Sequence, residues 1–354
     1  MLINVSDPTF QTILVSLILT GLLFISVKRT QNAGFFSKEV TNQLKGLAIL
    51  AVVFGHIGYF LSSDNRFLFP LSVASGVGVN IFLFLSGFGL TLSQLKSPLS
   101  SLSFYKKRLS KLFIPLWAVI TLVLLLDFFL LHRVYPIAEI VHSLLGFYPK
   151  ANLWQSLDSP LWYFSPILFY YLVFPLLFFK KIPLLSPLLI LLLSWLLLNL
   201  PLPVKSDVLK LYKLHSLAFP LGMLFALVIP YLKFKLNRIV KILIIGAATL
   251  VFLYTAYYSG VGQDPKIEQG ISLITTFSAI VIFALSKLEF GLFSIFGIYS
   301  YEIYLLHWPI VSRFNPFLGL PPFLDVTLNL GLFILLGYVL QKGIEKIAKQ
   351  FILT

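Results

Sequence analysis

Residues 112–131 read LFIPLWAVITLVLLLDFFLL, and this stretch decides the fold. A helix needs about 20 predominantly apolar residues to cross the hydrocarbon core of a bilayer, and this run contains one charge, Asp127. Similar runs recur along the chain, and they are continuous rather than alternating, which favours helices over barrel strands. The sequence therefore predicts an all-α, polytopic membrane protein with about 10–11 transmembrane helices. The predicted spans are residues 10–27, 44–62, 76–94, 112–131, 161–179, 184–200, 214–232, 239–257, 270–286, 293–311 and 325–341.

The composition of the whole chain agrees with this prediction. Of its 354 residues, 58% are hydrophobic and 11% are charged, whereas a soluble domain carries roughly 25% charged residues. The chain therefore lacks the polar surface of a soluble globule. It contains no cysteine, which excludes disulfides, Cys-ligated metals and thiol catalysis.

The formal net charge of +14, from 27 Lys and Arg against 13 Asp and Glu, is explained by topology better than by nucleic acid. Cytoplasmic loops of membrane proteins accumulate Lys and Arg. If the N-terminus lies outside, 19 of the 27 basic residues fall on the cytoplasmic side and 8 outside. This bias predicts an N-out, C-in orientation.

The first span is expected to be a retained transmembrane helix. A cleaved signal peptide carries basic residues before its apolar core, but residues 1–9 contain no Lys or Arg, and the basic pair Lys28 and Arg29 follows the run. We therefore expect residues 1–37 to form an extra N-terminal helix with an inner loop.

His56 is the clearest candidate for chemistry inside a span. It lies 11 residues after Lys45, which places it roughly 16 Å from the cytoplasmic interface and close to the bilayer midplane. A neutral imidazole in a dry site can take a proton from a hydroxyl or a thiol. The alternative is a histidine that only hydrogen-bonds to a neighbouring helix, and position alone leaves both open.

The tenth span carries a second polar cluster, made by Tyr301, Glu302, Tyr304 and His307. A carboxylate near the middle of a span must find a partner or stay protonated. His307 is a candidate proton relay or an interfacial residue. The two tyrosines share the neighbourhood of Glu302, although aromatic residues at helical spacing are more often packing than chemistry.

Four cations follow the third span within six residues: Lys106, Lys107, Arg108 and Lys111. Such a cluster suits the phosphates of a nucleotide-containing donor, and a topogenic or lipid-headgroup role is the alternative. Ser86, Gly87 and Phe88 lie near the inner end of the third span. They indicate either close helix contact or room for a ligand.

Together these segments resemble the acyltransferase 3 family of membrane proteins, which includes O-acetyltransferases of bacterial lipopolysaccharide O-antigens and other surface glycans. The resemblance rests on several ordered motifs between about residue 38 and residue 345. These are Lys45 to His56, Gly78 to Phe88, Arg108-Leu-Ser-Lys111 with Pro115, Leu161-Trp162 through Tyr171 and Pro175, Phe296-Gly297, and Ser300 to His307.

The resemblance implies a membrane domain at residues 38–345, followed by a cytoplasmic tail at 346–354, in a bacterial inner membrane. It implies an O-acyltransferase that moves an acyl group, most simply acetyl from cytoplasmic acetyl-CoA, to a hydroxyl of an extracytoplasmic glycan. His56 would be the general base, oriented by Glu302 or held near Lys45, without a metal. Ser86, Trp162, Tyr301, Tyr304 and His307 would support it, and the basic cluster would bind the donor phosphates.

The chain departs from the family pattern at four positions. Lysines replace arginines at Lys45 and Lys111, and a carboxylate pair common in relatives is replaced by Ile167 and Leu168. Two alternatives remain. One is a secondary transporter or glycan flippase with a buried His and Glu relay, and the other is a catalytically inactive protein on the same fold.

Overall fold

The structure is a computed structural model that is almost entirely helical. It describes residues 2–30, 36–151, 157, 159–231, 236–260 and 264–352, with only the backbone described at 159 and 347–352. Within these residues, nine helices are long and apolar enough to cross a bilayer. The prediction of an all-α, multi-pass membrane protein is confirmed.

The chain divides into two compact units. Unit 1 contains residues 1–82 and 234–341, and unit 2 contains residues 83–233 and 342–354. The first helix contacts α12 and so belongs to unit 1.

Unit 1 is built around one helix, which begins with Ser37 as its N-cap and carries His56 at its far end. Its elements are α1 (Pro8–Ile25), β1 (Val27–Arg29), α2 (Lys38–Gly55), the π-helical turn η1 (His56–Leu61), η2 (Leu71–Val73), the start of α3 (Ser75–Lys96), α10 (Arg238–Tyr258), α11 (Pro265–Ser286), β2 (Leu288–Phe290), α12 (Gly291–Ile298), α13 (Ser300–Arg313) and most of α14 (Pro322–Ile352). Strands β1 and β2 pair antiparallel, with Lys28 opposite Glu289.

Helices α2 and α12 pack with their backbones in direct contact, and two glycines make this possible. A Cβ on Gly46 would overlap the carbonyl of Phe293, and a Cβ on Gly297 would overlap the carbonyl of Asn42. Small residues let helix backbones approach closely in membranes, where the surrounding lipid is as apolar as the side chains. The contact therefore sets where α12, and α13 after it, lie against α2.

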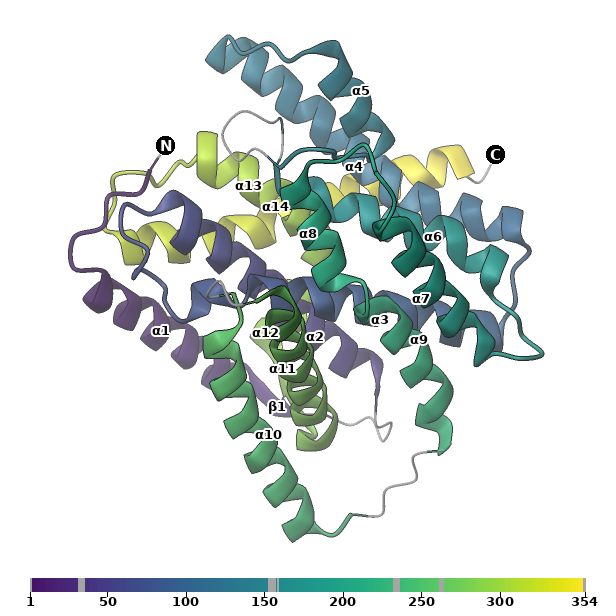
Figure 1. Ribbon diagram of the computed structural model, residues 1–354. Coiled ribbons are helices and arrows are strands. Elements are labelled where there is room, and N and C mark those ends of the chain that lie inside the picture. Colours follow the sequence, from purple (N-terminus) through teal and green to yellow (C-terminus); the bar gives the residue numbers. More distant parts are fainter. Residues whose placement is uncertain are drawn as a thin grey trace. The chain divides into compact units, whose positions relative to one another are not determined.

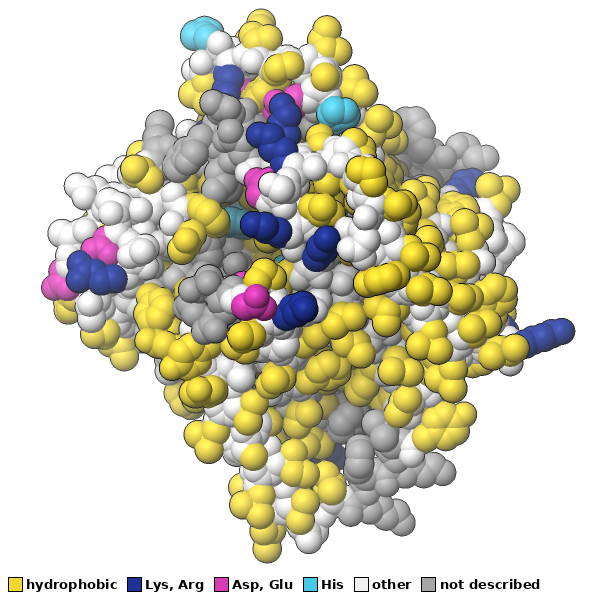
Figure 2. Space-filling view, viewed as in Figure 1, with side chains coloured by type: hydrophobic (Ala, Val, Ile, Leu, Met, Phe, Trp, Pro, Cys, Tyr) yellow, Lys and Arg dark blue, Asp and Glu magenta, His cyan; other side chains and the backbone are white. Residues whose placement is uncertain are grey.

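Exposed apolar side chains distinguish the helices that face lipid. Figure 2 shows hydrophobic side chains over the segment labelled α10 in Figure 1, and only 6% of the apolar window of α10 is buried. Helix α10 contacts α11 along its length, and α11 is far more buried. Within unit 1, α10 therefore faces lipid, whereas α11 lies further inside.

Unit 2 combines the 31-residue helix α4 with several shorter helices. Its elements are the second half of α3, α4 (Ser101–Leu131), α5 (Ile137–Leu145), η3 (Ser159–Tyr163), α6 (Phe164–Leu177), α7 (Leu185–Leu198), α8 (Ser206–His215), α9 (Ala218–Val228) and η4 (Ile229–Tyr231). Gly87 on α3 and Gly222 on α9 each face backbone of the other helix. In the motif at Ser86, the glycine therefore serves close helix contact, one of the two roles considered from the sequence.

The predicted single span at residues 293–311 is wrong, because two helices meet there at Tyr299. The Ser300 hydroxyl donates to the Gly297 carbonyl at 3.0 Å. Serine side chains that bond nearby backbone compete with helical hydrogen bonding, and glycine lowers helix propensity. The break lets α13 run in its own direction.

The basic cluster is helical, although it lies between the spans predicted at residues 76–94 and 112–131. Helix α4 begins at Ser101 rather than at 112, with the Ser100 hydroxyl accepting from the Ser103 N–H at 3.3 Å. Helix α7 has 14 residues, which is shorter than the nine long candidate spans.

Replacing Gly297 with alanine is expected to destabilise the protein by about 1–3 kcal/mol, because the added methyl group overlaps the Asn42 carbonyl and the backbones must separate. The melting temperature in detergent should fall by several degrees. The matched control is Gly331→Ala on α14, where a Cβ meets nothing within 4 Å, so that its melting temperature should stay level or rise slightly. Equal melting temperatures for the two variants would contradict the packing described above.

Candidate functional site

Two histidines far apart in the sequence meet inside unit 1. His56 is the first residue of the π-helical turn η1, and His307 lies in the middle of α13. Their rings are 5.0 Å apart between centroids, and Nδ1 of His56 lies 2.8 Å from Nε2 of His307. Single π-helical turns within α-helices occur frequently at functional sites. The chain thus places an imidazole–imidazole hydrogen bond within two apolar helical segments.

The hydrogen bonds of His307 assign the tautomers of the pair. Nδ1 of His307 lies 2.9 Å from the Tyr304 carbonyl and 3.1 Å from the Ile303 carbonyl. Carbonyl oxygens only accept, so this nitrogen carries the proton, and in a neutral ring Nε2 is then an acceptor. His56 must therefore donate from Nδ1. Nε2 of His56 then carries no proton, and its lone pair is available as a base.

The two rings differ in how accessible they are. His307 is 0% exposed, whereas His56 is half-buried. The edge of Trp308 lies against His56 at 5.5 Å between centroids, and Phe60 lies at 6.0 Å. Among the described residues, no hydrogen bond holds Nε2 of His56. The pair therefore has one fully enclosed member and one partly exposed member.

The charge of Glu302 acts on Lys45. Glu302 is 7% exposed, Lys45 is half-buried, and the carboxylate attracts the Lys45 ammonium electrostatically. The residue against His56 is thus His307, where the sequence suggested Glu302 or Lys45. Tyr304 lies 6.4 Å from His307 and 6.5 Å from Tyr301 between ring centroids.

In unit 2, two of the predicted residues, Ser86 and Arg108, come together at Tyr171. The Tyr171 hydroxyl on α6 interacts with the Ser86 hydroxyl on α3 and with the positive charge of Arg108 on α4. Nε of Arg108 is buried and forms no hydrogen bond within the described residues. Lys106, Lys107 and Lys111 are exposed on the same helix. This cluster offers an inward-facing guanidinium and three surface ammonium groups to an anion.

Trp162 has a partner that the sequence analysis did not single out. It lies on η3 and stacks on His215 of α8 at 5.8 Å, with the ring of Tyr212 at 6.2 Å. His215 is 3% exposed. Trp308 was likewise missed, since an aromatic residue in an apolar span carries no local signal. The sequence signal that could have pointed to His215 is its place at the end of an amphipathic segment.

The described residues contain no group of three or more His, Asp or Glu side chains able to hold a metal ion. The groups described above are bases, hydroxyls and cations. In unit 1 they can accept and relay a proton, and in unit 2 they can bind an anion.

Comparisons with known proteins give the family. Residues 41–341 match the family model described as "Acyltransferase domain". No curated protein matches the chain, and no solved structure matches it. The matched region contains both histidines of the pair and the whole basic cluster. The chain belongs to the acyltransferase 3 family and is a multi-pass membrane acyltransferase.

Proposed function

We propose that the protein transfers an acyl group, most simply acetyl, from cytoplasmic acyl-CoA to a hydroxyl of an extracytoplasmic glycan such as lipopolysaccharide O-antigen, in a bacterial inner membrane. The observation that carries this proposal is the His56–His307 hydrogen bond, which leaves Nε2 of His56 unprotonated. A base of this kind is what O-acylation by a thioester needs, because the acceptor hydroxyl must lose its proton.

In the proposed reaction, Nε2 of His56 takes the proton of the acceptor hydroxyl while its oxygen attacks the thioester carbonyl. The tetrahedral intermediate collapses by breaking the carbon–sulfur bond. The leaving thiolate takes the proton from the His56 imidazolium, so that the products are an O-acyl ester and free CoA. The thioester is already activated, and proton transfer by a positioned base contributes about 10²–10⁴-fold to such a rate.

His307 is a positioning residue in this scheme. Its Nε2 accepts from Nδ1 of His56 and so holds the other nitrogen in the basic tautomer. The logic is that of a catalytic triad, in which a third group fixes the tautomer and the ring orientation of the histidine. Here the third group is neutral, and it is itself fixed by two backbone carbonyls of α13.

The donor is assigned to the basic cluster of unit 2. The CoA phosphates would contact Lys106, Lys107, Arg108 and Lys111, on the cytoplasmic side in the predicted N-out, C-in orientation. The support is the buried Nε of Arg108, which has no hydrogen-bond partner among the described residues, since a buried donor without an acceptor is costly and is satisfied by an anionic ligand.

His56→Ala should lower acyl transfer by about 10²–10⁴-fold, because the general base is removed. The measurement uses purified protein with radiolabelled acetyl-CoA and a glycan acceptor. His132→Asn is the matched control, since His132 is an exposed residue that ends α4 in the left-handed conformation, which asparagine tolerates. Transfer that persists at the normal rate in His56→Ala would remove His56 from the mechanism.

His307→Phe should lower kcat by about 10²-fold or more while leaving KM for the donor unchanged, because His56 loses the acceptor that fixes its tautomer. His307→Gln is the rescue variant, since its side-chain oxygen can accept from Nδ1 of His56. A purely structural role for His307 predicts equal losses in both variants, and a rise in KM alone would also count against positioning.

Arg108→Ala should raise KM for acetyl-CoA by about tenfold or more, since a hydrogen bond to a charged group contributes about 1.5–3 kcal/mol. Arg108→Lys should recover part of this loss, because lysine keeps the charge without the planar fork. Arg238→Ala, at the exposed start of α10, is the control and should leave KM unchanged. If Arg108→Ala and Arg238→Ala raise KM for acetyl-CoA equally, the effect is general electrostatics and the assigned donor site is refuted.

A further inference from the structure

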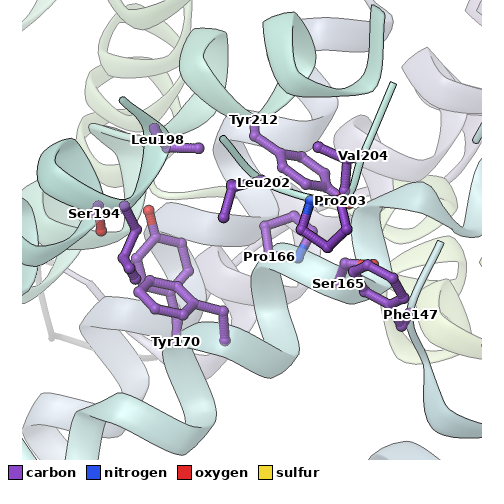
Figure 3. Close-up of a pocket in the computed structure, with 12 residues that line it drawn as sticks. Phe147, Ser165, Pro166, Tyr170, Ser194, Leu198, Leu202, Pro203, Val204 and Tyr212 are labelled. Atoms are coloured by element: carbon purple, nitrogen blue, oxygen red, sulfur yellow. The ribbon is translucent and has the colours of Figure 1, made fainter. Parts of the chain in front are cut away.

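Unit 2 contains an apolar cavity of about 230 Å³ that the proposed reaction does not use. Its walls come from α6, α7, α8 and the loops before α6 and after α7. Figure 3 shows Leu202 between Leu198 on one side and Pro166 and Val204 on the other. Apolar cavities of roughly 150 Å³ already stay dry and take up a benzene-sized guest. This cavity is large enough for a short length of hydrocarbon chain.

The hydroxyl groups in the wall of the cavity already donate hydrogen bonds to backbone carbonyls. Tyr170 donates to the Ser216 carbonyl at 2.9 Å, and Ser194 donates to the carbonyl one helical turn before it at 2.7 Å. Ser165 donates to the Gly146 carbonyl at 3.3 Å. A polar ligand would therefore find few free donors, whereas an apolar one displaces no protein hydrogen bond.

Cations surround the loops that form the wall. Lys205 follows the lining residue Val204, and its backbone N–H donates to the Pro149 carbonyl at 2.9 Å, which brings the segment carrying Lys150 beside it. Lys210 and Lys213 flank the lining residue Tyr212 on α8. All four lysine side chains are exposed, and Figure 2 shows Lys and Arg gathered over α8.

Acidic groups beside these lysines offset only part of the positive charge. Asp207 is exposed in the first turn of α8. Glu139 lies in the wall of a second cavity of about 130 Å³, which shares Phe147 with the first and includes Lys150 and His142. The Glu139 carboxylate accepts from the Leu157 N–H at 2.6 Å. Among the described residues, four lysines against two carboxylates leave a net positive surface beside an apolar cavity.

Topology does not account for these lysines. In the predicted N-out, C-in orientation they face outside and make up 4 of the 8 basic residues there, although the positive-inside rule concentrates Lys and Arg on the other side. The wall of the first cavity contains no charged residue, and neither does that of an apolar cavity of about 280 Å³ in unit 1, between α1, α2, α10 and α12. In unit 2, exposed lysines adjoin the lining residues Val204 and Tyr212 in the sequence.

We propose that unit 2 binds one phosphate-bearing lipid, whose hydrocarbon chain occupies the apolar cavity and whose phosphate lies against Lys150 and Lys205. An ammonium near a phosphate forms a charge-assisted hydrogen bond, and the chain gains roughly 25 cal/mol for each Å² of apolar surface removed from water. The site binds an amphiphile because it recognises both ends. This inference does not depend on the acyl-transfer mechanism.

The test measures binding of three probes to the full-length protein in a non-ionic amphipol by isothermal titration calorimetry. Decyl phosphate carries both a chain and a phosphate, decanol carries only the chain, and methyl phosphate carries only the phosphate. Decyl phosphate should bind saturably and more tightly than either of the others. Because acyl transfer is not measured, failure of this test and failure of the proposed enzyme activity are separate results.

Two variants examine the two ends of the site. Lys150→Ala with Lys205→Ala should weaken decyl phosphate by about 25-fold, since each lysine near an anionic phosphate contributes about fivefold, and should leave decanol unchanged. Leu202→Trp fills the cavity and should weaken both decyl phosphate and decanol. The controls are Lys180→Ala with Lys181→Ala, an exposed pair between α6 and α7, and Leu188→Trp, which is 62% exposed on α7.

The proposal is overturned if decanol binds as tightly as decyl phosphate, if the Lys150 and Lys205 variant binds normally, or if no probe binds saturably. Normal binding by Leu202→Trp would move the chain out of this cavity and is equally decisive. The lysine variant keeps the test sharp if Leu202→Trp fails to fold, because surface lysines can be replaced with little effect on stability.

Discussion

A buried imidazole in a bilayer must find its hydrogen-bond partners inside the protein, and the pairing of His56 with His307 follows from that constraint. His307 is fully buried, so its Nδ1–H must be satisfied, and two carbonyls of its own helix do this. The remaining nitrogen of His307 can then only accept. All hydrogen bonds of the pair therefore run one way. His56 donates to His307, and His307 donates to the backbone of α13, so that the outward nitrogen of His56 carries no proton.

The backbone contact between α2 and α12 supports this arrangement. Gly46 and Gly297 bring the two helices together, and α13 follows α12 after the break at Tyr299. Neither glycine touches a histidine. Packing several turns away thus determines whether two nitrogen atoms lie at hydrogen-bonding distance, and this is why close packing of interiors matters to chemistry.

Much of the fold and several candidate residues could be predicted from the sequence, because a bilayer constrains each segment of the chain separately. Apolar runs show the spans, and the ionisable residues within them, such as His56, Glu302 and His307, stand out as candidates. Which of them pair could not be predicted, because the partner of His56 depends on how α2 and α13 cross. Glu302 lies five residues before His307 in the sequence, yet its charge acts on Lys45.

The predicted ends of the membrane spans were wrong for a different reason. Spans were placed by apolarity, which ends where charges begin, but α4 continues through its four cations because Ser100 caps it and Lys, Arg and Leu favour helices. The break at Tyr299 was missed because a glycine and a serine in an apolar run read as ordinary small residues. Trp308 and His215 become visible only in the structure, where Trp308 meets the His56 ring edge-on and Trp162 stacks on His215.

The π-helical turn at His56–Leu61 has one more consequence. Such a turn accommodates an extra residue within a helix and changes the direction of the side chains beyond it. A loss of one residue between His56 and Leu61 would let the helix wind as an ordinary α-helix and would rotate Phe60 away from the His56 ring. The length of this segment therefore constrains the site more directly than the identity of its individual side chains.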